Sequence, residues 1–311
     1  MLSLKTASQK LLAENLAVKK DEKVTVVTDR KSCPIFNAVC SAAISRGAAL
    51  TKVRISSRRT HSSPIPTLND TFKKSDVIIA ITDKSISHSP ETRRARKLRG
   101  ARVISMVEVN KALFLKAMSA DAQRIRRIGD KLAEKLRRSK TVTITTPNGA
   151  YFTVETERKA ISVDDGDSTK KGTINNIPYG EVTMAPIEMA EGTVAIDFAR
   201  NHLKPKDNGK VFVKHGMIIG CTNSAKSFVG YLKKTDGNRA LKVVELGLGI
   251  NPGHKTLIYN VIHDEKIFGS VHIAFGGLGD KRKCKIHEDV ILLKPTVYFD
   301  NHVVIRNGVI L

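Results

Sequence analysis

The chain has 311 residues, 41% of them hydrophobic, and a formal net charge of +23. This length allows two domains that each bury a core. No apolar run approaches the roughly 18 residues of a membrane helix, and the charged N-terminus lacks the apolar centre of a signal peptide, so we expect a cytoplasmic protein. The four cysteines lie far apart without C-x-x-C spacing, which favours reduced thiols over disulfides or a thiolate zinc site.

The positive charge is concentrated in the first part of the chain. Residues 1–140 carry 31 Lys and Arg against 12 Asp and Glu, a net of +19, whereas the other 171 residues carry a net of +4. Such asymmetry raises the alternative of a nucleic-acid partner, with the arginines of "RRARKLR" as phosphate contacts. We favour a solvated basic surface, because the basic clusters lack aromatic residues for base stacking.

Helical and strand patterns alternate over residues 1–140. Helical segments such as "LKTASQKLLAENL", "PIFNAVCSAAISRG" and "SPETRRARKLRG" alternate with strand-like runs such as "KVTVVTD", "AALTKVRI", "DVIIAIT" and "ARVISM". Strands separated by helices predict a parallel sheet covered on both faces, and therefore a Rossmann-like α/β domain. No G-x-G-x-x-G loop follows the first strand, so we assign no dinucleotide.

Residues 141–311 have a different pattern. A basic helix is expected over residues 121–139, and "TVTITTPNGAYFTVETE" then predicts a hairpin with Asn148 and Gly149 at its turn. Many short strands follow, with "SAKSFVGYLKKT" and "NPGHKTLIYNVIHDEK" as helical candidates. We therefore predict a strand-rich α+β domain over residues 141–311, which carries the chemistry described next.

The segment "IHEDVI" carries a histidine and an aspartate two residues apart. In a strand, His287 and Asp289 project to one face and Glu288 to the other. A His and a carboxylate placed in this way can bind the same first-row metal ion. The alternative at this point is a hydrogen-bonded structural pair.

Three further residues strengthen the metal hypothesis. His272 lies in the apolar strand "SVHIAF", and Glu245 lies in the apolar, Gly-rich "KVVELGLGI", where an unpaired carboxylate would be costly. Glu181 follows the turn-like "NNIPYG", which would place it at a loop tip. With no thiolate nearby, this donor set fits zinc, cobalt, manganese or iron.

Four blocks resemble the aminopeptidase T and aminopeptidase S family of metallopeptidases: "NIPYGEVTMAPIEMAEGTVAID", "VVELGLGINPG", "HDEKIFGSVHIAFG" and "KIHEDVIL". The resemblance implies a two-domain chain with a dinuclear centre, and residue by residue its ligands fall on Glu181, Glu245, His272, His287 and Asp289. It implies two zinc, cobalt or manganese ions, a metal-activated water, and Glu181 or Glu245 as general base. A small peptide substrate and a homodimer are also expected.

Two features of this chain depart from those peptidases. No tyrosine follows the histidine in "HIAFGGLGDKRK", and the segment between His272 and His287 is short. A second group with the same resemblance, the ring-opening 2,5-dihydroxypyridine dioxygenases, is also compact and implies one Fe(II). There, His287 and Asp289 would bind iron together with His272, His254 or His263. We take the aminopeptidase as the main hypothesis and the dioxygenase as its alternative. Asp164, Asp165 and Asp167 could lie behind the metal ligands and help to recognise the amino terminus of a peptide, but we favour an exposed acidic turn.

Overall fold

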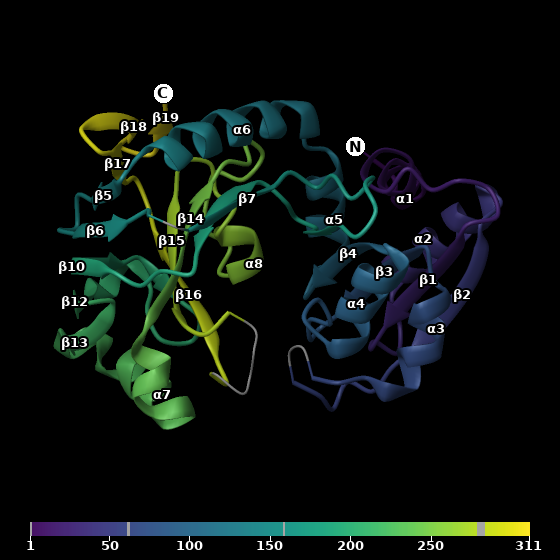
Figure 1. Ribbon diagram of the computed structural model, residues 1–311, viewed down its shortest axis with the longest axis horizontal. Helices are drawn as coiled ribbons and strands as arrows, with labels where there is room; N and C mark the ends of the chain where they lie inside the picture. The colour runs from purple at the N-terminus through teal and green to yellow at the C-terminus, as the bar shows by residue number, and fades with distance from the viewer. Residues whose placement is uncertain (1, 61–62, 158, 279–283) are drawn as a thin grey trace. The chain divides into compact units, whose positions relative to one another are not determined.

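The computed structural model describes residues 2–60, 63–157, 159–278 and 284–311. The chain is a mixed α/β protein with two compact units (Figure 1). The first unit comprises Met1–Asp121 and Asp164–Tyr179, and the second comprises Ala122–Val163 and Gly180–Leu311. These units divide the chain differently from the boundary near residue 140 that we expected from the sequence. The basic helix belongs to the second unit, and a later segment of the chain returns to the first.

A parallel sheet forms the centre of the first unit, as the alternating pattern predicted. Its strand order is β2-β1-β3-β4-β8, and every pair in it is parallel. The strands are β1 (Lys23–Thr28), β2 (Ala49–Arg54), β3 (Val77–Thr82), β4 (Arg102–Val107) and β8 (Ile174–Asn176). Every residue of β3 and β4 is buried, because central parallel strands are covered on both faces.

Helices of the first unit follow the predicted segments and add two that the sequence patterns did not indicate, α3 and α5. Side chains satisfy the first free amide groups of several helices, as Ser3 does for Thr6 and Asn110 does for Leu113. The helical segments are α1 (Leu4–Lys10), η1 (Leu11–Asn15), α2 (Pro34–Ser45), η2 (Pro66–Leu68), α3 (Asn69–Lys74), α4 (Pro90–Arg94), η3 (Ala95–Arg99) and α5 (Lys111–Met118).

An eight-stranded sheet of order β13-β12-β10-β6-β5-β17-β18-β19 lies in the second unit. It contains the predicted Asn-Gly hairpin, in which Gly149 has a φ of +92° that favours glycine. Its strands are β5 (Thr141–Thr145), β6 (Tyr151–Glu155), β10 (Ala190–Ile196), β12 (Gly209–Lys214), β13 (Met217–Cys221), β17 (Thr296–Phe299), β18 (His302–Arg306) and β19 (Val309–Ile310).

A six-stranded sheet of order β11-β16-β15-β14-β9-β7 also lies in the second unit and carries the predicted site residues. The strands β9, β14, β15 and β16 pair in antiparallel fashion across its centre. The strands of this sheet are β7 (Ala160–Asp164), β9 (Glu181–Ala185), β11 (Phe198–Ala199), β14 (Val243–Gly249), β15 (Val271–Gly276) and β16 (His287–Leu292).

The helices of the second unit differ from the sequence expectation in one place. The segment "NPGHKTLIYNVIHDEK", a helical candidate, contains only the short α8, because the chain there follows a loop. Among the described residues, no helix has both the length and the apolar character needed to cross a bilayer. The helical segments are α6 (Ala122–Arg138), η4 (Pro205–Asp207), η5 (Asn223–Ala225), α7 (Lys226–Asp236), η6 (Gly237–Leu241) and α8 (Val261–Asp264).

Candidate metal centre

The pairing of strands β9, β14, β15 and β16 places all five predicted ligands on one face of the six-stranded sheet. Residues directly opposite each other in an antiparallel pair project to the same face, as do alternate residues along one strand. The relevant pairs are Glu181 with Gly249, Gly247 with His272, Glu245 with Ala274, Ala274 with Asp289, and Gly276 with His287. Residues more than one hundred positions apart in the chain therefore share one surface.

Small residues between the ligands leave space on this face. A Cβ on Gly247 would lie 2.0 Å from Cε1 and 2.2 Å from Nε2 of His272, so the imidazole occupies the place of a side chain at residue 247. Ala274 lies between Glu245 and Asp289 in the same cross-strand row. The face is therefore a cradle for the histidine ring and the acidic side chains around it.

His272 is almost completely buried among carboxylates. Its side chain is 1% exposed, and Nε2 lies 3.7 Å from Oε2 of Glu181 and 3.7 Å from Oε1 of Glu245. Among the described residues, Nδ1 has no hydrogen-bond partner. Burial lowers the pKa of His272, but the nearby carboxylates of Glu245 and Glu181 outweigh burial and raise that pKa to about 9. The surroundings of this ring therefore favour a bound cation.

His287 and Asp289 form the second part of the site. Nδ1 of His287 lies 2.9 Å from the carbonyl oxygen of Gly277, which can only accept, so Nδ1 carries the proton. Nε2 then faces Oδ1 of Asp289 at 3.4 Å, and this buried oxygen accepts no hydrogen bond from the residues that the structure describes. In the neutral imidazole, two lone pairs face each other there. A proton or a metal ion relieves that contact, and a backbone partner on the far nitrogen is typical of metal-binding histidines.

Two functional residues were missed by the sequence reasoning, Glu265 and Lys266. Glu265 joins Glu181 and His272 in a buried group whose ligand atoms all lie within 4.8 Å of one another. Nζ of Lys266 lies 2.8 Å from Oε1 of Glu181. The segment "HDEK", a cluster of four polar residues between apolar ones, was the available signal. Glu181 itself is not at a loop tip, as we expected, but begins β9 and is buried.

The donor set fits a divalent first-row cation. It combines imidazole nitrogens with carboxylate oxygens, and Gly247 makes room for the His272 ring. Within the described part of the chain, Nδ1 of His272 and Oδ1 of Asp289 make no hydrogen bond. Of the five predicted ligands, Glu181 and His272 belong to the tight buried group, whereas Glu245, His287 and Asp289 lie outside it.

The other two histidines considered as iron ligands are occupied elsewhere. His254 is 1% exposed, and His263 lies buried in α8. Their rings stack with centroids 3.9 Å apart, and Nδ1 of His263 lies 2.9 Å from Oδ1 of Asp264. These contacts stabilise the loop after β14, and they leave His272 as the histidine beside the predicted acidic ligands.

Two other groups of polar residues belong to the first unit. Asp165 and Asp167 accept hydrogen bonds from backbone amides two residues later, as in an ordinary acidic turn. Two of the arginines considered as phosphate contacts are engaged within the protein: Arg96 donates to the carbonyl of Gly172, and Arg99 is paired with Asp76. A further basic side chain, Arg59, is paired with Asp29. A nucleic-acid partner therefore remains the alternative to a solvated basic surface, and these internal contacts do not favour it.

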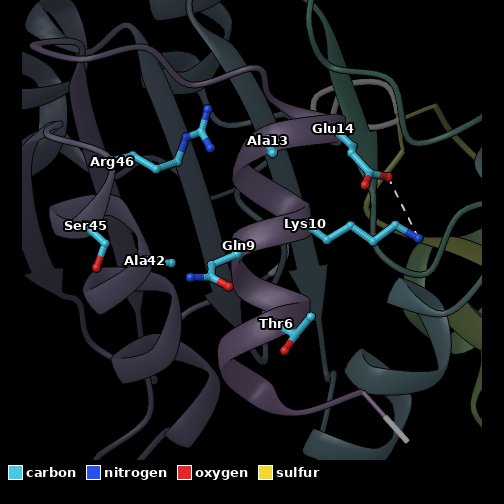
Figure 2. Close-up of a pocket in the computed structure, with 8 residues that line it drawn as sticks. All are labelled: Thr6, Gln9, Lys10, Ala13, Glu14, Ala42, Ser45 and Arg46. Atoms are coloured by element: carbon cyan, nitrogen blue, oxygen red, sulfur yellow. Dashed lines mark ion pairs between the residues drawn. The ribbon is translucent and has the colours of Figure 1, made fainter.

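A pocket of about 480 Å³ also lies in the first unit, between α1 with η1 and the end of α2 (Figure 2). Lys10 and Glu14 face each other across 3.9 Å at its margin. None of the five predicted ligands lines it, so it has no part in the metal centre.

The stretch in which the peptidase tyrosine is missing includes residues 279–283, and these lie outside the described residues.

The fold and the sheet face define an α/β enzyme with a candidate metal centre, and comparison with known proteins narrows that class. A family model described as 2,5-dihydroxypyridine 5,6-dioxygenase (NicX) matches residues 6–311. The chain belongs to this family. Comparison with curated proteins gives no match.

Two solved structures share the fold. The 2,5-dihydroxypyridine dioxygenase from Pseudomonas putida KT2440 superposes with a TM-score of 0.83 at 19% identity, covering 100% of this chain and 98% of that one. Wild-type AmpT from Thermus thermophilus gives a TM-score of 0.71 at 13% identity, covering 99% and 98%. Both identities are low, so these likenesses describe the fold alone.

The aminopeptidase hypothesis is therefore wrong as the main interpretation. The dioxygenase family accounts for nearly the whole chain, whereas the aminopeptidase likeness is a distant structural one. The chain superposes on both solved structures over nearly its full length, so the fold by itself does not separate the two activities. The enzymatic and metal-binding parts of the expectation agree with the family; the hydrolytic part does not.

Proposed function

We propose that this protein is a metal-dependent dioxygenase that opens the ring of a dihydroxylated pyridine or a closely related aromatic compound. The match of the dioxygenase family to residues 6–311 carries the proposal. The sheet face supports it, because it gathers imidazole and carboxylate donors of the type that bind non-haem iron. In this reaction both atoms of dioxygen enter the product as a ring carbon–carbon bond is broken.

We assign the iron ligands to His272, His287 and Asp289. Two histidines and one carboxylate form the donor set that is typical of Fe(II) oxygenases. When bound, Fe(II) would supply open coordination positions for dioxygen and for a hydroxylated ring and would pass electrons between them, while the ring itself provides the electrons that reduce dioxygen. The contact of His287 with the carbonyl of Gly277 directs Nε2 of this ring toward Asp289.

The remaining carboxylates have different roles in this proposal. Glu181 is buried and positions the ring of His272. The side chain of Glu245 is 20% exposed, so it can accept a proton from a hydroxyl group of an incoming substrate. Burial of His272 keeps bulk water away from one side of the centre. We also keep a small-molecule substrate, a homodimer and a cytoplasmic location as expectations from the protein class.

The experiment is oxygen uptake by protein loaded anaerobically with Fe(II). We expect uptake and loss of the aromatic absorbance with 2,5-dihydroxypyridine, and no release of leucine from leucyl peptides. His287→Ala is expected to lower iron retention by more than about tenfold. His215→Ala, at a side chain that is 68% exposed, is the matched control. Iron-loaded wild-type protein that consumes neither oxygen nor any dihydroxylated pyridine would contradict the proposal.

A further inference from the structure

A completely buried lysine lies beside the candidate metal centre. The side chain of Lys266 is 0% exposed, and its Nζ lies 2.8 Å from Oε1 of Glu181 and 2.5 Å from Oε1 of Glu265. Burying an ammonium group is costly unless it is paired with anionic groups and hydrogen-bonded to them. Two carboxylates meet this requirement here. Lys266 is therefore a resident cation between two acidic side chains.

The backbone holds Lys266 in this place. Its amide donates to the carbonyl of His263 at 3.1 Å, and its carbonyl accepts from the amide of Asn251 at 3.1 Å. Gly249 lets the segment come close, since a Cβ there would lie 2.1 Å from the carbonyl oxygen of Ile267. The backbone of Lys266 is thus held by a loop that packs directly on β14, and this fixes the point from which its side chain extends.

The two oxygens of Glu181 face different groups. Oε1 is paired with Lys266, whereas Oε2 lies 3.7 Å from Nε2 of His272. Glu181 and Glu265 are the carboxylates of the tight group that also includes His272. Without the lysine, Glu181 and Glu265 would present a second set of anionic oxygens, next to the proposed iron ligands. Such a set would attract a second divalent ion to the same face.

We propose that Lys266 limits this face to one divalent cation. Its ammonium group takes the oxygens of Glu181 and Glu265 that a second ion would need, and its charge repels such an ion. The inference rests on the proposed function, because it concerns the same metal centre. In this inference Lys266 selects a mononuclear centre, although the sheet face carries enough carboxylates for two ions.

The test measures how many Mn(II) ions each chain binds, by equilibrium dialysis and by electron paramagnetic resonance. Wild-type protein is expected to bind one Mn(II) per chain, with no signal from a spin-coupled pair. Lys266→Met keeps the length of the side chain but removes its charge, and this variant is expected to bind two. Its melting temperature is expected to rise steeply with Mn(II), because the ion replaces the lost ammonium group.

Lys159→Met is the matched control. It removes another lysine with a side chain only 5% exposed, paired with Glu188 at 3.1 Å, and should leave the stoichiometry at one. Two Mn(II) ions in wild-type protein, or one in folded Lys266→Met, would overturn the inference. If Lys266→Met does not fold, Lys266→Gln replaces it as the variant without the ammonium charge. The measurement on wild-type protein needs no variant, and two bound Mn(II) ions there would still overturn the inference. Wild-type protein that binds no Mn(II) and no Fe(II) would instead overturn the proposed function.

Discussion

The ring of His272 lies where the side chain of residue 247 would be, over the Cα of Gly247 on the neighbouring strand. The two residues are direct partners in the β14–β15 ladder, and a Cβ on Gly247 would lie 2.0 Å from Cε1 of the ring. A contact this short cannot be accommodated without moving the ring. The orientation of the candidate ligand therefore depends on the absence of a side chain one strand away.

Gly247→Ala is expected to displace the ring of His272 and to weaken metal binding by about 10- to 100-fold, as for other residues that orient a ligand. Isothermal titration with Mn(II) measures this effect. Gly230→Ala in α7 is the control, since a Cβ there meets nothing within 4 Å. Unchanged affinity in folded Gly247→Ala would show that the position of this ring does not matter for the metal.

Asp29→Ala is expected to destabilise the protein by about 3 kcal/mol. The buried carboxylate of Asp29 accepts from the amide of Asp83 at 2.9 and 3.0 Å and is paired with Arg59, so its removal leaves buried donors without partners. Denaturant unfolding followed by circular dichroism measures the change. Asp70→Ala, at an exposed side chain, should change stability by less than about 0.5 kcal/mol. Equal effects of the two substitutions would contradict this account.

Stability is expected to depend on pH through Asp300. The backbone amides of Lys140 and Thr141 donate to its carboxylate and lower the pKa of Asp300 below its usual value. A lowered folded-state pKa stabilises the protein above the unfolded value, about 3.9, and this contribution is lost as the pH falls through the folded value.

Asp300→Asn removes this dependence while keeping a residue that tolerates the φ of +52° at this position. The wild-type melting temperature should exceed that of the variant at pH 6, and the difference should shrink below about pH 4. Scanning calorimetry between these values measures it. A difference that stays constant over the whole range would mean that the carboxylate charge plays no part.

Binding to nucleic acid is expected to be weak at physiological salt despite the net charge of +23. Arg59 and Arg96 are bound to groups of the protein itself, so fewer basic side chains remain for phosphates. Fluorescence anisotropy with a labelled duplex at several salt concentrations measures this. Submicromolar affinity at about 150 mM salt, with a steep salt dependence, would restore the nucleic-acid hypothesis.

Local patterns in the sequence predicted much of the fold. β-branched runs such as "DVIIAIT" identified the buried parallel strands, because a strand covered on both faces is apolar at every position. Asn148 and Gly149 identified the β5–β6 hairpin, because Gly149 supplies the positive φ of the turn. The return of residues 164–179 to the first unit was not predictable, since no local signal specifies which sheet a short strand such as β8 will join.

At the candidate site, too, local patterns predicted some features and contacts between distant residues set the others. Strand alternation already predicts that His287 and Asp289 share a face, because it is a local property of the backbone. Folding of the whole chain is needed to bring Glu265 to Glu181 and His272 and to place Lys266 between two carboxylates. Those contacts depend on strand register and on a loop that packs against Gly249, and interactions between distant parts of the chain leave no periodic pattern in the sequence.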